Sequence, residues 1–168
     1  MKKFELTTEF ITNMFGKKLF RIKALVEFGN VKAGELGGYV EKEENVSQDG
    51  NAWVSGDARV YGDAEVSGDA RVSGNAEVSG NARVSGNARV SSDADYALVQ
   101  GFGTEFRCTT FYRGKNKKIM VNCGCFHGDL EGFRKQVKET RNGKIAKEYL
   151  MIADLMEYHF TSEDSSNE

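Results

Sequence analysis

Thiol and imidazole side chains, which can hold a metal ion or attack a substrate, gather in one short segment of this sequence. Cys123, Cys125 and His127 alternate with other residues, so an extended strand would place all three on one face. Structural zinc sites use Cys-x2–4-Cys spacing and four ligands. Here the spacing is shorter, and the nearest fourth ligand is Cys108. We therefore expect no bound metal and interpret the thiols as small packed side chains.

Catalytic combinations of other residue types are also missing from the sequence. No segment brings together a nucleophile, a general base and an orienting acid. The two histidines, His127 and His159, both lie in the last third of the chain. The double glycine at 37–38 is not followed by the Lys-Ser/Thr of a phosphate-binding loop. We predict a protein that is not an enzyme and that uses no cofactor.

Cationic and aromatic side chains form a second group, suited to binding. Residues 96–160 carry 11 basic and 7 acidic side chains, although the net charge of the whole chain is −2. The densest stretch contains Tyr112, Arg113, Lys115, Lys117 and Lys118. Such a surface suits an acidic protein, a small anion, or a nucleic acid whose bases stack on aromatic rings. Because the overall charge is negative, we favour a protein partner over nucleic acid.

A hexapeptide repeat determines the fold of the middle of the chain. Seven hexads of the form Ala-x-Val-x-Gly-Asx run from Ala52 to Asp93, and Ser92 is the one departure at the Gly position. Ala-x-Val is typical of a short strand with Ala and Val on one face. Gly-Asx favours a turn, because glycine adopts positive φ readily. Three hexads therefore close one triangular turn of a parallel β-helix.

The spacing of Val and Ala within this repeat resembles the hexapeptide-repeat left-handed β-helix family. Val54 with Ala58, four positions later, is the first of several such pairs. The resemblance implies a mainly β fold with a left-handed parallel β-helix of about three 18-residue rungs over residues 46–95. Many relatives of this kind are acyltransferases that use a histidine as general base. Both histidines here lie outside the repeat, so we do not expect that activity.

Residues 18 apart in the repeat should stack on adjacent rungs. The inward column contains Val54, Val72 and Val90. Two outward columns alternate in charge, as neighbouring strands prefer: Arg59, Glu77 and Asp95, and Glu65 with Arg83. The third outward column contains Trp53, Arg71 and Arg89, with no acid beside the two arginines. We interpret this third column as a further candidate surface for a partner.

Strand and helix patterns flank the repeat. Residues 1–45 contain two short strands and should cap the open end of the β-helix. Residues 96–160 are predicted to form an α+β (ββαα) module, in which Asp129 is the N-cap of the first helix. The second helix carries an apolar stripe of Ile145, Tyr149, Ile152, Met156 and Phe160. We expect this stripe to be the interface of a homo-oligomer, a dimer or trimer.

The ends of the chain carry few structural signals. Residues 161–168 are polar and acidic and should form a flexible tail. No apolar run reaches the roughly 20 residues of a membrane span, and the Met-Lys-Lys start lacks the apolar core of a signal peptide. These features predict a cytoplasmic protein that does not bind membranes.

Three segments together resemble a group of small bacteriophage and prophage proteins of largely unassigned function. They are LGGYVEKEENVSQDGNAWV, the hexads, and VNCGCFHGDLEGFRKQVKET. The resemblance implies action on a host factor, including defence systems such as CRISPR. We therefore predict an interaction protein that binds and blocks or adapts a host protein, in the manner of an anti-CRISPR inhibitor. The alternatives are sequestration of a small anionic ligand and nucleic-acid binding, both by the basic C-terminal module.

Overall fold

The computed structural model of the chain describes residues 1–161. The fold is mainly β, with 39% of residues in strands and 22% in helices, and its helical pair is C-terminal. The chain divides into two compact units, residues 1–93 and the residues from 94 onward. Of the predicted tail, Thr161 ends the last helix and the remainder lies outside the described residues.

The first unit begins with three strands that lead into the repeat. β1 (Phe4–Thr12) and β2 (Lys18–Ala24) form the predicted antiparallel hairpin. β3 (Leu36–Val40) pairs with β2 on one side and runs parallel to the repeat strand β5 on the other. Phe4 of β1 and Leu19 and Ile22 of β2 are fully buried. The N-terminal strands thus continue the sheet of the repeat.

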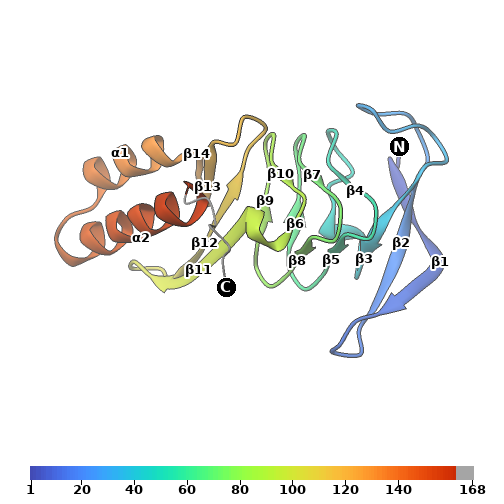
Figure 1. Cartoon of the computed structure of the whole chain (residues 1–168), viewed down its shortest axis with the longest axis horizontal. Helices are drawn as coiled ribbons and strands as arrows, with labels where there is room; N and C mark the ends of the chain where they lie inside the picture. The colour runs from blue at the N-terminus through green and yellow to red at the C-terminus, as the bar shows by residue number, and fades with distance from the viewer. Residues whose placement is uncertain (162–168) are drawn as a thin grey trace, which may run out of the picture. The chain divides into compact units, whose positions relative to one another are not determined.

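The hexads form seven two-residue strands that stack in parallel (Figure 1). They are β4 (Trp53–Val54), β5 (Arg59–Val60), β6 (Glu65–Val66), β7 (Arg71–Val72), β8 (Glu77–Val78), β9 (Arg83–Val84) and β10 (Arg89–Val90). β4, β7 and β10 make one stack, β5 and β8 a second, and β6 and β9 a third. Each strand therefore pairs with the strand three hexads away, which confirms the predicted 18-residue period.

The interior of the repeat consists of its Ala and Val side chains. Val54, Val72 and Val90 form the predicted inward column, and each is at most 1% exposed. The glycine at each corner has positive φ, and successive corners lie against one another. At Gly50, where φ is 68°, a Cβ atom would lie 2.8 Å from the carbonyl oxygen of Gly68. Glycine is therefore required at this corner both by its φ and by the close approach of the next rung.

The entry into the repeat is longer than one regular turn. Tyr39 pairs with Arg59 and Val46 with Val66, so the spacing there is 20 residues instead of 18. Asn45, at the end of the short 3-10 helix η1 (Glu43–Asn45), is fully buried beside this irregularity. Because of the two extra residues, backbone N–H and carbonyl groups at this corner do not meet the partners that they would have in a regular hexad.

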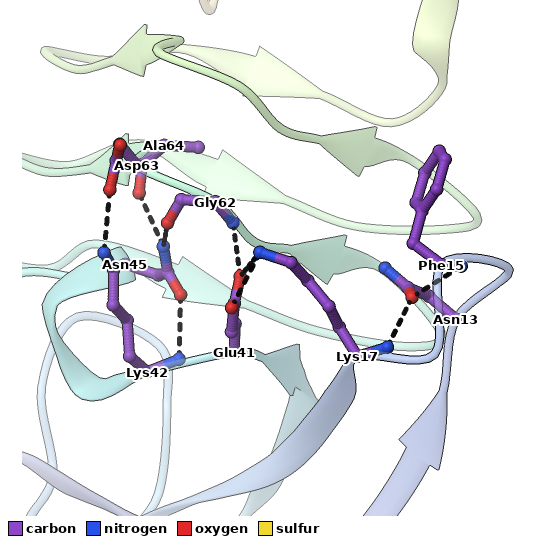
Figure 2. Close-up of polar contacts among 9 residues, drawn as sticks. All are labelled: Asn13, Phe15, Lys17, Glu41, Lys42, Asn45, Gly62, Asp63 and Ala64. Carbon is purple, nitrogen blue, oxygen red and sulfur yellow. Dashed lines mark hydrogen bonds and ion pairs between the residues drawn. The ribbon is translucent and has the colours of Figure 1, made fainter.

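Asn45 satisfies these displaced backbone groups with its side chain (Figure 2). Its Nδ2 donates to the carbonyl oxygens of Gly62 (3.1 Å) and Ala64 (2.8 Å), and its Oδ1 accepts the Lys42 N–H at 2.9 Å. The Glu41 carboxylate accepts the Gly62 N–H at 2.7 Å. Buried backbone groups must be paired in this way, so polar side chains replace the missing regular turn.

The N-terminal hairpin is tied to the same corner. Lys17 Nζ lies 2.9 Å from Glu41 Oε1. The turn that presents Lys17 is held by Asn13, whose Oδ1 accepts the N–H groups of Phe15 and Lys17 at 3.0 Å each (Figure 2). The hairpin and the first corner are thus joined by both strand pairing and an ion pair.

The second unit is a four-stranded antiparallel sheet with two helices. β11 (Tyr96–Phe102), β12 (Arg107–Arg113), β13 (Ile119–Cys123) and β14 (Phe126–Asp129) pair in chain order. The prediction of two strands was therefore wrong. β11 was missed because Gly101 and Gly103 resemble a loop, and β14 because a four-residue Phe-His-Gly-Asp segment has no strand signature.

The helices of the second unit agree with prediction. α1 (Leu130–Thr140) starts at Asp129, whose Oδ1 accepts the Gly132 N–H at 2.8 Å, so the predicted N-cap is confirmed. α2 (Gly143–Thr161) follows after a short connection and lies beside α1 (Figure 1). No helix among the described residues is long and apolar enough to cross a membrane.

The apolar stripe of α2 belongs to the core of the second unit. Tyr149, Ile152, Met156 and Phe160 are each at most 9% exposed, and Ile145 packs against the same core. The prediction that this stripe forms an oligomer interface was therefore wrong. The ring of Phe133 on α1 contacts Tyr149 at a centroid distance of 5.8 Å. The four-stranded sheet and α1 cover this stripe, which the predicted two-stranded hairpin would have left exposed.

Candidate functional site

The turn between β12 and β13 contains three lysines within four residues. The Gly114 N–H donates to the Lys118 carbonyl at 2.8 Å, and the Lys117 N–H donates to the Gly114 carbonyl at 3.0 Å. Lys117 has a φ of 59°, which tightens the turn. Lys115, Lys117 and Lys118 are all exposed. We call residues 114–118 the lysine turn.

The charges of this region are only partly neutralised. Lys118 Nζ lies 3.5 Å from Asp129 Oδ2. Arg113 lies 3.1 Å from Asp95 and stacks over the Phe160 ring at 5.4 Å, so it holds the unit together. Within residues 1–161, Lys115 and Lys117 make no ion pair. Two of the predicted binding residues thus carry charge that the described chain does not balance.

Tyr112 does not belong to this surface. It was predicted to bind a partner together with the lysines, but Tyr112 is 0% exposed, so this prediction was wrong. Its hydroxyl lies 3.4 Å from His127 Nδ1. β12 is an inner strand, and both Phe111 and Tyr112, on its opposite faces, are buried. Because β12 is buried on both faces, neither of these two rings is accessible to a partner.

The arginine column of the repeat is arranged as predicted, except for its aromatic member. Trp53, Arg71 and Arg89 stack in register, but Trp53 is only 2% exposed. The rings of Phe4 and Phe28 lie against it at centroid distances of 6.3 and 5.4 Å. Trp53 therefore belongs to the core beneath the N-terminal cap, and its assignment to a partner-binding surface was wrong.

The two arginines of the column are partly engaged within the first unit. Arg89 Nη1 donates to the carbonyl oxygens of Ala88 (2.8 Å) and Asp69 (2.9 Å). Burial, together with the adjacent Arg89, lowers the pKa of Arg71. Because Arg71 is partly buried and Arg89 donates to backbone carbonyls, this column has fewer hydrogen-bond donors left for a partner.

In the other two outward columns, arginine side chains pair with glutamate side chains. Arg59 and Glu77 lie 3.9 Å apart, as do Arg83 and Glu65, which confirms two of the predicted pairs. Asp95, predicted to continue the first column, instead pairs with Arg113 in the second unit. The repeat has ended by this point, in the short 3-10 helix η2 (Asp93–Asp95).

The thiols and His127 contact neighbouring residues of the sheet. Cys123 pairs with Phe126 across the β13–β14 turn and accepts a hydrogen bond from Thr109 Oγ1 at 3.1 Å. His127 Nδ1 lies 2.6 Å from Asn122 Oδ1. Among the residues described, no three His, Cys, Asp or Glu side chains are arranged to hold a metal ion.

A small pocket in the second unit was not predicted. It has a volume of about 80 Å³, and its lining includes Arg107, Cys123, Cys125, Arg141 and Tyr149. Arg107 is the first residue of the inner strand β12, and Arg141 follows α1. Only the packing of α1 on the sheet brings these residues together, so sequence spacing gives no signal for the pocket.

Comparisons with known proteins support the repeat alone. Residues 76–92 match the family described as YdcK beta solenoid repeat. These residues include β8, β9 and β10, so the match agrees with the solenoid geometry of the first unit. The comparison with curated proteins found no match.

Proposed function

We propose that this protein is a non-enzymatic binding protein whose lysine turn docks on an acidic surface of a partner protein. The observation that carries the proposal is the unbalanced charge of Lys115 and Lys117 on a turn fixed by two backbone hydrogen bonds. Charges held in place this way steer a partner of opposite charge and fix its register. The two arginines of the solenoid column differ from these exposed lysines, because Arg71 is partly buried and Arg89 donates to backbone carbonyls.

A protein partner fits this surface better than nucleic acid does. Non-specific nucleic-acid binding needs cations that follow the backbone and aromatic rings on which bases stack. The lysine turn is a single short segment, and Tyr112, on the adjoining strand β12, is buried. Residues 46–95 carry 4 basic and 8 acidic side chains and would repel phosphates.

The first unit would serve as a rigid scaffold for this contact. We propose a left-handed coil of about three 18-residue turns, as the hexapeptide pattern implies. The resemblance to bacteriophage proteins makes a cytoplasmic host protein, such as a CRISPR component, the first partner to test. Binding would block or adapt that protein in stoichiometric amounts.

Self-association would use a different face from the one first expected. The apolar stripe of α2 is buried, whereas Met151, Leu155 and Tyr158 on its other side are 59–72% exposed. We propose this outer face for a dimer or trimer. Light scattering tests it, since Leu155→Glu should yield monomers if the face is used and leave the mass unchanged if it is not.

The docking proposal is tested by charge reversal with a matched control. The substitutions Lys115→Glu, Lys117→Glu and Lys118→Glu should abolish capture of the partner from a nuclease-treated host lysate, as identified by mass spectrometry. The control reverses three exposed lysines of the helices, Lys135, Lys138 and Lys147, and should capture normally. Equal capture by both variants, or equal loss, would contradict docking at the lysine turn.

A further inference from the structure

The pocket of the second unit has the size of a small oxyanion. Its volume is about 80 Å³, and a water molecule takes up about 30 Å³ in the liquid. The pocket therefore has room for two or three waters or for one tetrahedral anion. It is lined by the β13–β14 turn, the end of α1 and the Tyr149 side chain of α2.

The charged lining of the pocket is predominantly positive. Arg107 and Arg141 supply two guanidinium groups, against one carboxylate from Glu105. Within residues 1–161, the Arg107 side chain makes no hydrogen bond or ion pair. Arg141 Nη1 donates only a long bond of 3.5 Å, to the Thr140 carbonyl. Both guanidinium groups therefore retain donors for a ligand.

The backbone permits this placement of Arg107. Gly124, in the β13–β14 turn, has a φ of 60°, and a Cβ atom there would collide with Arg107 Nη1. Glycine at this position thus allows the guanidinium group to lie directly against the turn. The same turn carries Cys123 and Cys125 into the lining, so the cation and the thiols share one wall.

Tyr149 closes the pocket without cancelling its charge. Its hydroxyl donates to the Phe102 carbonyl at 3.2 Å. Burial, and then the neighbouring Cys123, raises the pKa of Tyr149. The phenol therefore remains neutral at physiological pH, and the electrostatics of the pocket are set by Arg107, Arg141 and Glu105.

We propose that this pocket binds a phosphate group, held by the guanidinium groups of Arg107 and Arg141. Guanidinium groups match phosphate oxygens in geometry and bond them in pairs. Two arginines favour a phosphate dianion over a singly charged carboxylate. This site is separate from the lysine turn, and neither proposal depends on the other.

Calorimetric titration of the full chain with inorganic phosphate tests the proposal, with acetate at equal ionic strength as the comparison. We expect one saturable phosphate site and at least tenfold weaker binding of acetate. The double substitution Arg107→Gln, Arg141→Gln should weaken phosphate binding at least tenfold. Lys135→Gln, Lys138→Gln removes the same charge from the exposed side of α1 and should change nothing. The proposal would be overturned by unsaturable phosphate binding, by equal binding of acetate, or by an equal loss in the control.

A thiol measurement tests the proposal in the unaltered chain. Cys125 is exposed and lines the pocket, whereas Cys108 does not line it. Phosphate should slow alkylation of Cys125 by iodoacetamide at least threefold, and the rate at Cys108 should stay constant. Unchanged alkylation of Cys125 at saturating phosphate would overturn the proposal even if the double variant fails to fold.

The source of the phosphate is assigned by a third titration, with glycerol phosphate. Tighter binding of glycerol phosphate than of inorganic phosphate would identify a phosphoester metabolite as the ligand. Tighter binding of inorganic phosphate would identify the free ion. Either order of affinity supports the site, whereas unsaturable binding of inorganic phosphate overturns it.

Discussion

The two units of this protein carry surfaces that differ in how far their charged side chains are paired. In the solenoid, the 18-residue period places arginine beside glutamate, as in Arg59 with Glu77 and Arg83 with Glu65. In the C-terminal unit, one tight turn gathers lysines of like charge, and Lys115 and Lys117 have no ion pair within the described residues. Two outward columns of the repeat contain such pairs, and in the third Arg71 is partly buried and Arg89 donates to backbone carbonyls. Recognition is therefore better sought where the sequence becomes irregular.

The two units also differ in how they are stabilised. The solenoid interior contains only small Ala and Val side chains, and its corners depend on glycines in close backbone contact. The C-terminal unit is held by large aromatic side chains packed between sheet and helices, with Phe133 at the centre. The units should therefore respond to different kinds of substitution.

The largest effect is expected from Phe133→Ala in the C-terminal unit. Phe133 is 3% exposed and contacts the rings of Phe111, Phe126 and Tyr149. Truncating such a side chain costs about 3–5 kcal/mol. Lys147→Ala, at an exposed position of α2, should stay within about 0.5 kcal/mol. Urea denaturation followed by circular dichroism measures both, and similar losses would show that α1 does not anchor the core.

A smaller but still large effect is expected from Gly50→Ala in the solenoid. A left-handed conformation costs a non-glycine residue about 1–2 kcal/mol, and the close approach of Gly68 adds about 1–3 kcal/mol of overpacking. Gly16→Ala is the control, because Gly16 also has positive φ but nothing within 4 Å of its Cβ position. Equal losses of unfolding free energy would contradict the role assigned to stacked corners.

Asn45→Ala should cost about 2–3 kcal/mol, since it leaves two carbonyls and one N–H of a buried corner unpaired. Asn51→Ala removes one exposed side-chain hydrogen bond, from Nδ2 to Asp69 Oδ1, and should cost less than about 0.5 kcal/mol. The two unfolding free energies measure whether Asn45 replaces a regular turn. A loss at Asn45 no larger than that at Asn51 would show that it does not.

The smallest expected effect is a pH dependence within the first unit. Burial lowers the pKa of Lys3 to about 8, although its Nζ donates to the Ala52 carbonyl at 3.0 Å. An unfolded lysine titrates near pH 10.4, so between pH 8 and 10 the unfolded chain binds more protons. Stability should therefore rise across this range, by about 1 kcal/mol after solvent screening. Lys3→Met should lack this rise in denaturation experiments at pH 7.5 and 9.5, and an identical profile would exclude Lys3 as its source.

The regular part of the fold could be predicted from the sequence, because each hexad specifies its own strand, turn and neighbours. The columns of Val54, Val72 and Val90 and of Arg71 with Arg89 follow from the period alone. The 20-residue entry turn could not be predicted, because it depends on side-chain hydrogen bonds of Asn45 and Glu41.

The parts that could not be predicted depend on contacts between distant segments. Trp53 and Tyr112 were placed on surfaces because local alternation cannot show which faces are covered. The pocket joins Arg107 and Arg141, which are 34 positions apart and lie in different elements. The lysine turn is the exception, because a hairpin turn is a local structure and its exposure follows from the sequence.

The contrast between the two units is tested most directly by removing equal charge from each and measuring partner capture. One variant carries Lys115→Gln and Lys117→Gln in the lysine turn, and the other carries Arg71→Gln and Arg89→Gln in the solenoid column. If the C-terminal unit provides the recognition surface, the first variant loses at least tenfold of the captured partner protein, while the second captures as much as the unaltered chain. Capture that survives the lysine substitutions and falls with the arginine substitutions would contradict the account and place recognition on the solenoid.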